Sequence, residues 1–356
     1  MGIAWLKGTT GTVKLRIRNY RPIPVVGSIT MQALRLQVPN DAGGWDVVAL
    51  TVSPTTSQSF YIPTGASTEF TYTYTGLPNH VALGILEAKY DMPCHDEENG
   101  AGPNNGTNGN FEPWEWQYVL DAAPIGLQAI PWADFLQYAC RWGYGAIGAA
   151  DVKVNMTNGM HLSTRSPAHR LQYVSALKVK YVIEAVNDKV PPYDPNDVTP
   201  GKLKVKWFTS DMDSSPTVYM QCDEFSAYLQ LAMAAHGVTT ESRRYHGYNG
   251  NVLHDFTTNL ICPANFDRNN PGNYATPTFH NHVAVADVGD RYDSSCSSWK
   301  TPYGVLHKNP AAPFGFPAWF QNVISGVPYG LVKDPNPCAG FEWILPYSGH
   351  VNFSGT

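Results

Sequence analysis

The chain has 356 residues and a formal net charge of −5, which is long enough for two domains or one large one. The acidic balance, and the absence of lysine and arginine clusters among aromatic residues, exclude a typical nucleic-acid-binding surface. Only 15% of residues are charged, whereas glycine, proline and tyrosine number 31, 28 and 20, and this composition indicates a β-rich protein with many turns.

The first third of the chain alternates apolar and polar residues in short runs. Val13–Arg18, Val47–Val52 and Thr68–Tyr74 each read as a strand with one wet face, separated by turn residues. We therefore predict an all-β antiparallel sandwich as an accessory domain over residues 1–110. The loop-like composition of Asn99–Gly109 places a linker at its end.

The second domain is predicted to cover residues 111–356. Pro131–Trp142 indicates a helix that starts with proline and ends before glycine. Residues 168–187 fit a helix or a strand, and the prolines of Val190–Pro195 mark a loop. Lys202–Trp207 alternates and is expected to be a strand.

The segment from Cys222 to Gly237 is predicted to be a helix with a cysteine in its first turn. Apolar residues recur along it at helical spacing, which gives one buried face, and Gly237 fits its C-terminal cap. A thiol at a helix N-terminus faces unpaired backbone N–H groups and the positive end of the helix dipole. Both favour the thiolate, which is the nucleophilic form of cysteine.

The motif Tyr-x-Gln-Cys-x-x-Phe-Ser-Ala, from Tyr219 to Ala227, resembles the transglutaminase-like superfamily. His282 heads a Val-Ala-Val-Ala strand and Asp293 follows Tyr292 further along, in the order of that family's triad. The resemblance implies an α+β core of papain-like, transglutaminase-like type, preceded by the β-sandwich, with Cys222, His282 and Asp293 as catalytic residues. Met220 and Asp223 depart from the glycine and tryptophan of the animal enzymes, so the substrate stays open.

The pairing of two strands supports the choice of Asp293. If a two-residue turn at Val288–Gly289 joins them, Asp287 pairs with Asp290 and Ala284 pairs with Asp293. His282 is two residues from Ala284 and so shares a face with Asp293, within reach of a carboxylate–imidazole bond.

His280 shares the same predicted face, but His282 is preferred because it heads the continuous strand. The two histidines suggest a metal site as an alternative, yet no third ligand is placed by spacing, so neither a metal nor a cofactor is predicted. The acidic runs Cys94–Asn99 and Asp211–Asp213 lack the ligand ladder of a calcium loop and are expected to be solvated.

These roles predict cysteine-dependent acyl transfer or hydrolysis at amide bonds of protein or peptide substrates. The Cys222 backbone N–H is expected to bind the oxyanion, and Gln221 and Trp207 are candidates for the second donor. Water would release the thioester by hydrolysis or deamidation, and an amine would release it by cross-linking. The alternative is a non-enzymatic structural, assembly or binding protein.

The cellular location is predicted from the absence of a membrane span and of a secretory signal in the sequence. No apolar run is long enough to span a bilayer, and Met1–Lys7 lacks the layout of a secretory signal. A cytoplasmic protein is expected, or the processed form of an exported one. Six widely spaced cysteines without a Cys-x-x-Cys pair exclude a zinc ribbon and favour buried thiols, with one or two disulfides as the alternative (Cys94, Cys140, Cys222, Cys262, Cys296 and Cys338).

Overall fold

A computed structural model describes most of the chain up to residue 249 and short segments beyond it. The described residues are 2–40, 44–96, 104–105, 110–125, 133–162, 170–173, 181–183, 202–249, 252–254, 256–257, 260–261, 278–279, 281–287, 290–294, 298–300, 306–308, 314–315, 330–333, 342–343 and 352–353. Among them, no helix is long and apolar enough to cross a membrane.

The chain forms two compact units. The first comprises Met1–Leu120 together with Asn352–Thr356, and the second comprises Asp121–Val351. Strand β10 (Glu112–Leu120), which lies beyond the boundary expected at residue 110, therefore belongs to the first unit.

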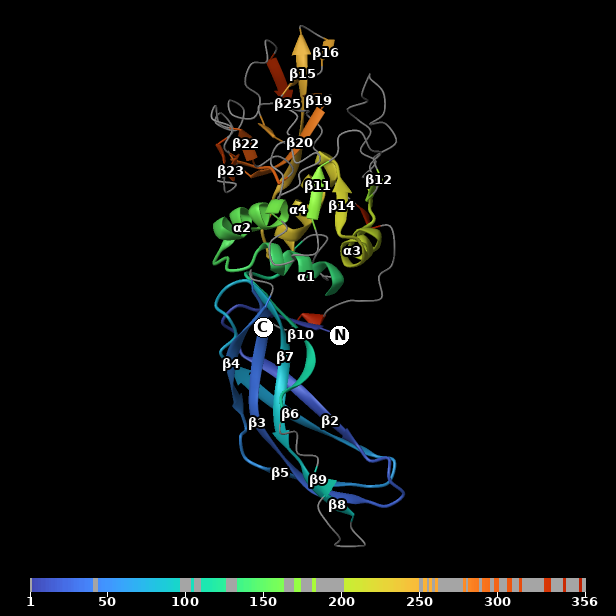
Figure 1. Ribbon diagram of the computed structural model, residues 1–356. Helices are drawn as coiled ribbons and strands as arrows, with labels where there is room; N and C mark the ends of the chain where they lie inside the picture. The colour runs from blue at the N-terminus through green and yellow to red at the C-terminus, as the bar shows by residue number, and fades with distance from the viewer. Residues whose placement is uncertain are drawn as a thin grey trace. The chain divides into compact units, whose positions relative to one another are not determined.

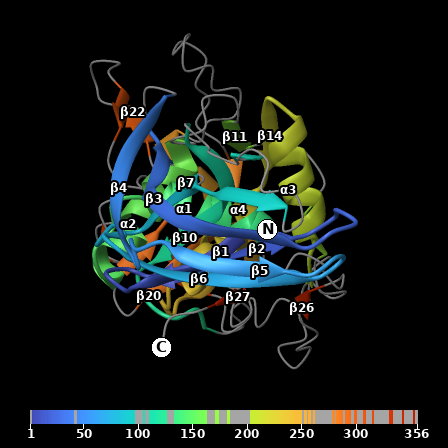
Figure 2. The ribbon, with the colours of Figure 1, turned by 90° about the horizontal axis from the view of Figure 1, so that it is seen from below.

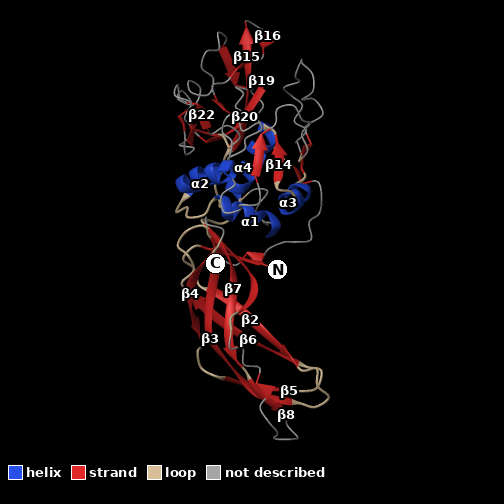
Figure 3. Cartoon of the chain, viewed as in Figure 1, coloured by secondary structure: helices blue, strands red, loops and turns tan. Residues whose placement is uncertain are grey.

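The first unit is built from one eleven-stranded sheet (Figures 1 and 3). Its order is β2-β6-β4-β3-β7-β10-β1-β27, with β5 and β8 paired to β3 and β9 paired to β8. β1 runs parallel to β10 and β27, and every other described pairing in this sheet is antiparallel. The strands are β1 (Gly2–Leu6), β2 (Gly11–Arg18), β3 (Val25–Pro39), β4 (Trp45–Ser53), β5 (Gln58–Ile62), β6 (Ser67–Thr75), β7 (Ala82–Asp91), β8 (Pro93–Asp96), β9 (Asn104–Asn105), β10 and β27 (Asn352–Phe353).

This sheet curls into a nearly closed barrel (Figure 2). Side chains from strands far apart in the sequence meet inside it. The Gln117 side-chain oxygen on β10 accepts hydrogen bonds from the Trp5 indole N–H of β1 and, at 2.8 Å, from the Tyr74 hydroxyl of β6. Trp5 and Tyr74 also pack edge to face. Burial raises the pKa of Tyr74, which keeps its hydroxyl protonated as a donor.

The second unit combines four described helices with five smaller sheets. The helices are α1 (Ala133–Trp142), α2 (Ala149–Leu162), α3 (Val205–Ser214) and α4 (Cys222–Ala234). The largest sheet has the order β16-β15-β20-β21-β24, with β25 paired to β15. The strands are β11 (Arg170–Tyr173), β12 (Val182–Ile183), β13 (Lys202–Leu203), β14 (Thr217–Met220), β15 (Glu241–Asn249), β16 (Val252–His254), β17 (Phe256–Thr257), β18 (Leu260–Ile261), β19 (Thr278–Phe279), β20 (Asn281–Asp287), β21 (Asp290–Tyr292), β22 (Ser298–Lys300), β23 (Leu306–Lys308), β24 (Phe314–Gly315), β25 (Gly330–Lys333) and β26 (Glu342–Trp343).

An aromatic core joins α1, α3 and α4. Phe208 of α3 packs on Tyr228 of α4 with ring centroids 4.2 Å apart, and Phe135 of α1 lies 5.9 Å from Tyr228. All three side chains are buried. Helix α4 is therefore buried almost all round, and the expectation of a single buried face is wrong for it.

The strand predicted over Lys202–Trp207 is also wrong beyond its first two residues. β13 covers Lys202–Leu203, and α3 begins at Val205. The buried residues of α3 recur at helical spacing (Val205, Phe208, Thr209 and Met212). The prediction used only the six residues Lys202–Trp207, which are too few to show the helical spacing that continues to Met212.

The predicted fold class, an antiparallel sandwich followed by a papain-like, transglutaminase-like α+β core, is contradicted. The first unit holds one curled sheet with parallel pairings instead of two facing antiparallel sheets. The described part of the second unit is dominated by short strands in small sheets and does not form a papain-like core. A local motif around Cys222 carried the resemblance, and a local motif does not determine how the other strands pair.

Candidate functional site

Cys222 is the first residue of α4, as predicted, and it is a thiol rather than half of a disulfide. Gln221 is the N-cap, and the first helical bond runs from the Phe225 N–H to the Gln221 carbonyl at 2.9 Å. The amide of Cys222 thus precedes the intrahelical bonds and lies at the positive end of the helix dipole. Its side chain is only 4% exposed.

The C-terminus of α4 also follows the prediction. Gly237 has a φ of +77°, a conformation that favours glycine. The N–H of Gly237 donates to the Ala234 carbonyl, and the N–H of Val238 donates to the Met233 carbonyl. These bonds satisfy carbonyls that would otherwise end the helix without partners.

Helix α4 packs against β20, the strand that contains His282. β20 pairs with β21 in the predicted register, in which Val285 faces Tyr292 and Asp287 faces Asp290. Continued by one residue, this register places Ala284 beside Asp293. The register of the hairpin is confirmed for three pairs, from Val285–Tyr292 to Asp287–Asp290.

Asp293 directly follows β21 and is 7% exposed, beside Ser294, which is 2% exposed. The Ser294 hydroxyl contacts the Met160 sulfur of α2 at 3.5 Å. Asp287, in contrast, accepts a hydrogen bond from the Lys153 ammonium of α2 and forms an ion pair with it. The Asp287 carboxylate is therefore engaged by α2.

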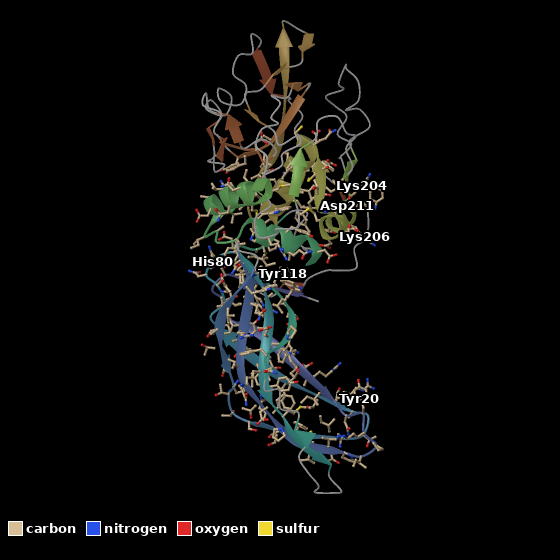
Figure 4. All side chains as sticks on the ribbon, viewed as in Figure 1. Tyr20, His80, Tyr118, Lys204, Lys206 and Asp211 are labelled. Atoms are coloured by element: carbon tan, nitrogen blue, oxygen red, sulfur yellow. The ribbon has the colours of Figure 1, made fainter. Side chains whose placement is uncertain are left out.

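The structure places the two predicted oxyanion donors differently. The Gln221 backbone N–H donates to the Glu224 carboxylate at 2.9 Å, so this amide is engaged. Trp207 lies in the first turn of α3 with 51% of its side chain exposed, and the Lys204 ammonium lies 4.5 Å from its ring centroid. Figure 4 labels Lys204, Lys206 and Asp211 in this region. Trp207 is on the solvent face of α3 instead of among buried groups.

A buried cysteine and histidine lie side by side in the second unit. The Cys140 sulfur of α1 is 3.9 Å from Nε2 of His236, and the Asp121 backbone N–H donates to Nδ1 of the same ring. Burial lowers the pKa of His236 to about 3 and raises the pKa of Cys140. Both groups are neutral near neutral pH, so this pair does not provide a thiolate.

Glu224 is the site residue that sequence reasoning missed. It is 1% exposed, and its two carboxylate oxygens accept from the backbone N–H groups of Gln221 and Tyr181. The signal was the spacing of Gln221 and Glu224, because a glutamate three residues after the N-cap is typical of a capping box.

Several expectations fall outside the described residues. They concern His280, the side chain of His282, and the thiols of Cys262, Cys296 and Cys338. Within the described part, no group of three metal-ligating side chains is found.

Comparison with known proteins found no matching family model and no matching curated protein. Among solved structures, the chain is similar to an ASH/PapD-like domain of human CEP192 at 15% identity, covering 33% of this chain and 78% of that one, with a TM-score of 0.21. It is similar to the class 5 fimbriae chaperone CfaA at 13% identity, covering 34% and 52%, with a TM-score of 0.20. A family 123 glycoside hydrolase from Clostridium perfringens matches at 11% identity over 61% and 41%, with a TM-score of 0.20. The match thus spans about half of the chaperone, and likeness at these TM-scores does not establish a shared fold.

Proposed function

We propose that the protein catalyses cysteine-dependent acyl transfer or hydrolysis at amide bonds of protein or peptide substrates, with Cys222, His282 and Asp293 as its triad. The observation that carries the proposal is the packing of α4, which starts at Cys222, against β20, which contains His282. The motif resemblance to the transglutaminase-like superfamily supports the chemistry, although the fold expected from it is not retained.

In the proposed mechanism, the Cys222 thiolate attacks the carbonyl carbon of the amide. The Cys222 backbone N–H donates to the oxyanion that forms. The C–N bond then breaks, and the leaving amine takes a proton from the His282 imidazolium, which leaves a thioester on Cys222. Asp293 orients the imidazole and stabilises its charged form. Water or a second amine attacks the thioester and releases Cys222.

A test separates these outcomes with one substrate. The protein is incubated with β-casein and a fluorescent primary amine, and amine incorporation, ammonia release and peptide-bond cleavage are followed together. Incorporation identifies a transglutaminase, ammonia without incorporation identifies a deamidase, and cleavage identifies a protease. Cys222→Ala should abolish the product, and Cys94→Ala, at a partly exposed thiol of the first unit, is the matched control. Activity that survives Cys222→Ala contradicts the proposal.

A non-enzymatic structural or binding role is the second candidate. The 4% exposure of Cys222 favours it, because a buried cysteine in a helix is often a packing residue. In that case Cys222→Ala should lower the melting temperature clearly, and no product should form. In the enzymatic case the variant should melt near the wild type and lose its product.

A further inference from the structure

Glu224 is a buried carboxylate that bonds to two separate segments of the chain. It is the third residue of α4 and is 1% exposed. One oxygen accepts from the Gln221 N–H, directly before Cys222, and the other accepts from the Tyr181 N–H, before β12. Burying a carboxylate is costly unless its oxygens are hydrogen-bonded, so these two bonds keep Glu224 in place.

Tyr181, whose N–H donates to Glu224, is itself held by several other hydrogen bonds. The Tyr181 carbonyl accepts from the Lys204 N–H at 2.7 Å and from the Tyr228 hydroxyl at 3.3 Å. The Tyr181 hydroxyl donates to the Asp211 carboxylate of α3 at 2.6 Å. Glu224 therefore connects the start of α4 to a buried support shared with α3.

We infer that Glu224 is a positioning residue for Cys222, holding the Gln221–Cys222 backbone so that the Cys222 amide and thiol keep their place at the start of α4. The inference rests on the proposed function, because it assigns Glu224 a part in presenting the same nucleophile. The carboxylate accepts from the Gln221 N–H, in the residue directly before Cys222.

A positioning role and a purely electrostatic role predict opposite results. A carboxylate two residues from the thiol disfavours the thiolate, so removing its charge alone would lower the thiol pKa. Glu224→Gln also turns one of the two acceptors into an N–H donor that faces a backbone N–H. If the first turn then loses its alignment, the helix end stabilises the thiolate less and the thiol pKa rises.

The experiment compares alkylation of the Cys222 peptide by iodoacetamide against pH, followed by mass spectrometry, in wild type, Glu224→Gln and Asp223→Asn. Asp223→Asn is the matched control, since this substitution removes one charge from the same turn. We expect Glu224→Gln to raise the apparent thiol pKa by about one unit, which slows alkylation about tenfold below that pKa. Asp223→Asn should leave the pKa unchanged or lower it. A lowered or unchanged pKa in Glu224→Gln overturns the inference.

Hydrogen exchange in the wild-type protein gives a second test that needs no variant. The Gln221 and Tyr181 amides should both be protected, because both donate to the buried carboxylate. Exchange of either amide at the unprotected rate overturns the inference. Failure of the proposed function gives a different result. Cys222 of the wild type would then titrate as an ordinary thiol, while Glu224→Gln would still raise its pKa.

Discussion

The Lys153 ammonium of α2 donates a hydrogen bond to the Asp287 carboxylate at the end of β20. Burial acts to lower the pKa of Lys153, but the carboxylate and the nearby Tyr292 hydroxyl together hold it above its usual value. The ion pair connects α2 to the hairpin that carries His282. It also assigns Asp287 a structural role.

Breaking this ion pair should reduce stability without affecting the thiol. The two side chains are 15% and 25% exposed, so we expect a coupling energy of about 1 to 2 kcal/mol in a double-mutant cycle of Lys153→Met and Asp287→Asn. Urea denaturation of the four proteins measures it. Iodoacetamide alkylation of Cys222 should stay within a few-fold of wild type in both single variants. A coupling near zero would show that the pair does not tie α2 to the hairpin.

Asp293→Asn should instead affect the thiol and turnover. An amide cannot stabilise an imidazolium and can hold the wrong tautomer, so turnover should fall by several orders of magnitude, on the scale of about 10⁴ seen when a triad carboxylate is neutralised. The apparent pKa of the Cys222 thiol should rise, because its ion pair with His282 is weakened. Alkylation rates against pH measure the shift.

The control for Asp293→Asn is Asp290→Asn, at the start of the strand that Asp293 follows. Asp290→Asn lies at the paired position of Asp287 and should leave alkylation near wild type. If Asp287→Asn or Asp290→Asn raises the Cys222 pKa more than Asp293→Asn does, the triad assignment is wrong.

Two adjacent residues of α3 should respond very differently to alanine. Phe208 is fully buried against Tyr228, whereas Trp207 is 51% exposed. Phe208→Ala should cost about 3 to 5 kcal/mol of the free energy of unfolding, and Trp207→Ala should cost less than about 1 kcal/mol. Chemical denaturation checks both. Equal costs would contradict the buried position of Phe208 and the exposed position of Trp207.

His236 should make the second unit sensitive to acid. Its pKa is about 3 in the folded protein, against an ordinary value of 6.5. The unfolded chain therefore binds a proton at a pH where the folded protein does not. This neutral histidine contributes full stability above pH 6.5 and loses it as the pH falls toward 3. Between pH 7 and pH 5 the loss from this group should be about 2 kcal/mol.

His236→Gln removes this titration and serves as the comparison. Urea denaturation of both proteins at pH 5, 6 and 7 isolates the contribution of His236 to stability, because all other groups titrate alike in the two proteins. The wild type should lose more stability than the variant over this range. Equal slopes against pH would mean that His236 is accessible to protons in the folded protein.

The sequence contained the local structure of the site but not its surroundings. Alternation predicted the strands around Val13–Arg18 and Thr68–Tyr74, since each has one buried face. The Val288–Gly289 turn predicted the hairpin register, because a two-residue turn leaves only one pairing. The helix from Cys222 followed from its apolar residues at helical spacing and from Gly237 at its C-terminal cap.

The wrong predictions share a cause, which is long-range pairing. β3 pairs with β4, β5, β7 and β8 along its length, and no spacing within Val25–Pro39 encodes so many partners. These pairings produce one curled sheet, and the predicted antiparallel sandwich therefore does not form. The role of Glu224 was hidden in the same way, because Tyr181 lies 43 residues away from it.

The titration of Cys222 with iodoacetamide tests the central claim most directly. Cys140 serves as an internal reference, because burial raises its pKa and should leave it unreactive in the folded protein. If Cys222 is the nucleophile, its alkylation should follow an apparent pKa well below the ordinary value of about 8.5, and His282→Ala should raise that pKa. A Cys222 that reacts only at high pH, or only as slowly as Cys140, contradicts the enzymatic account.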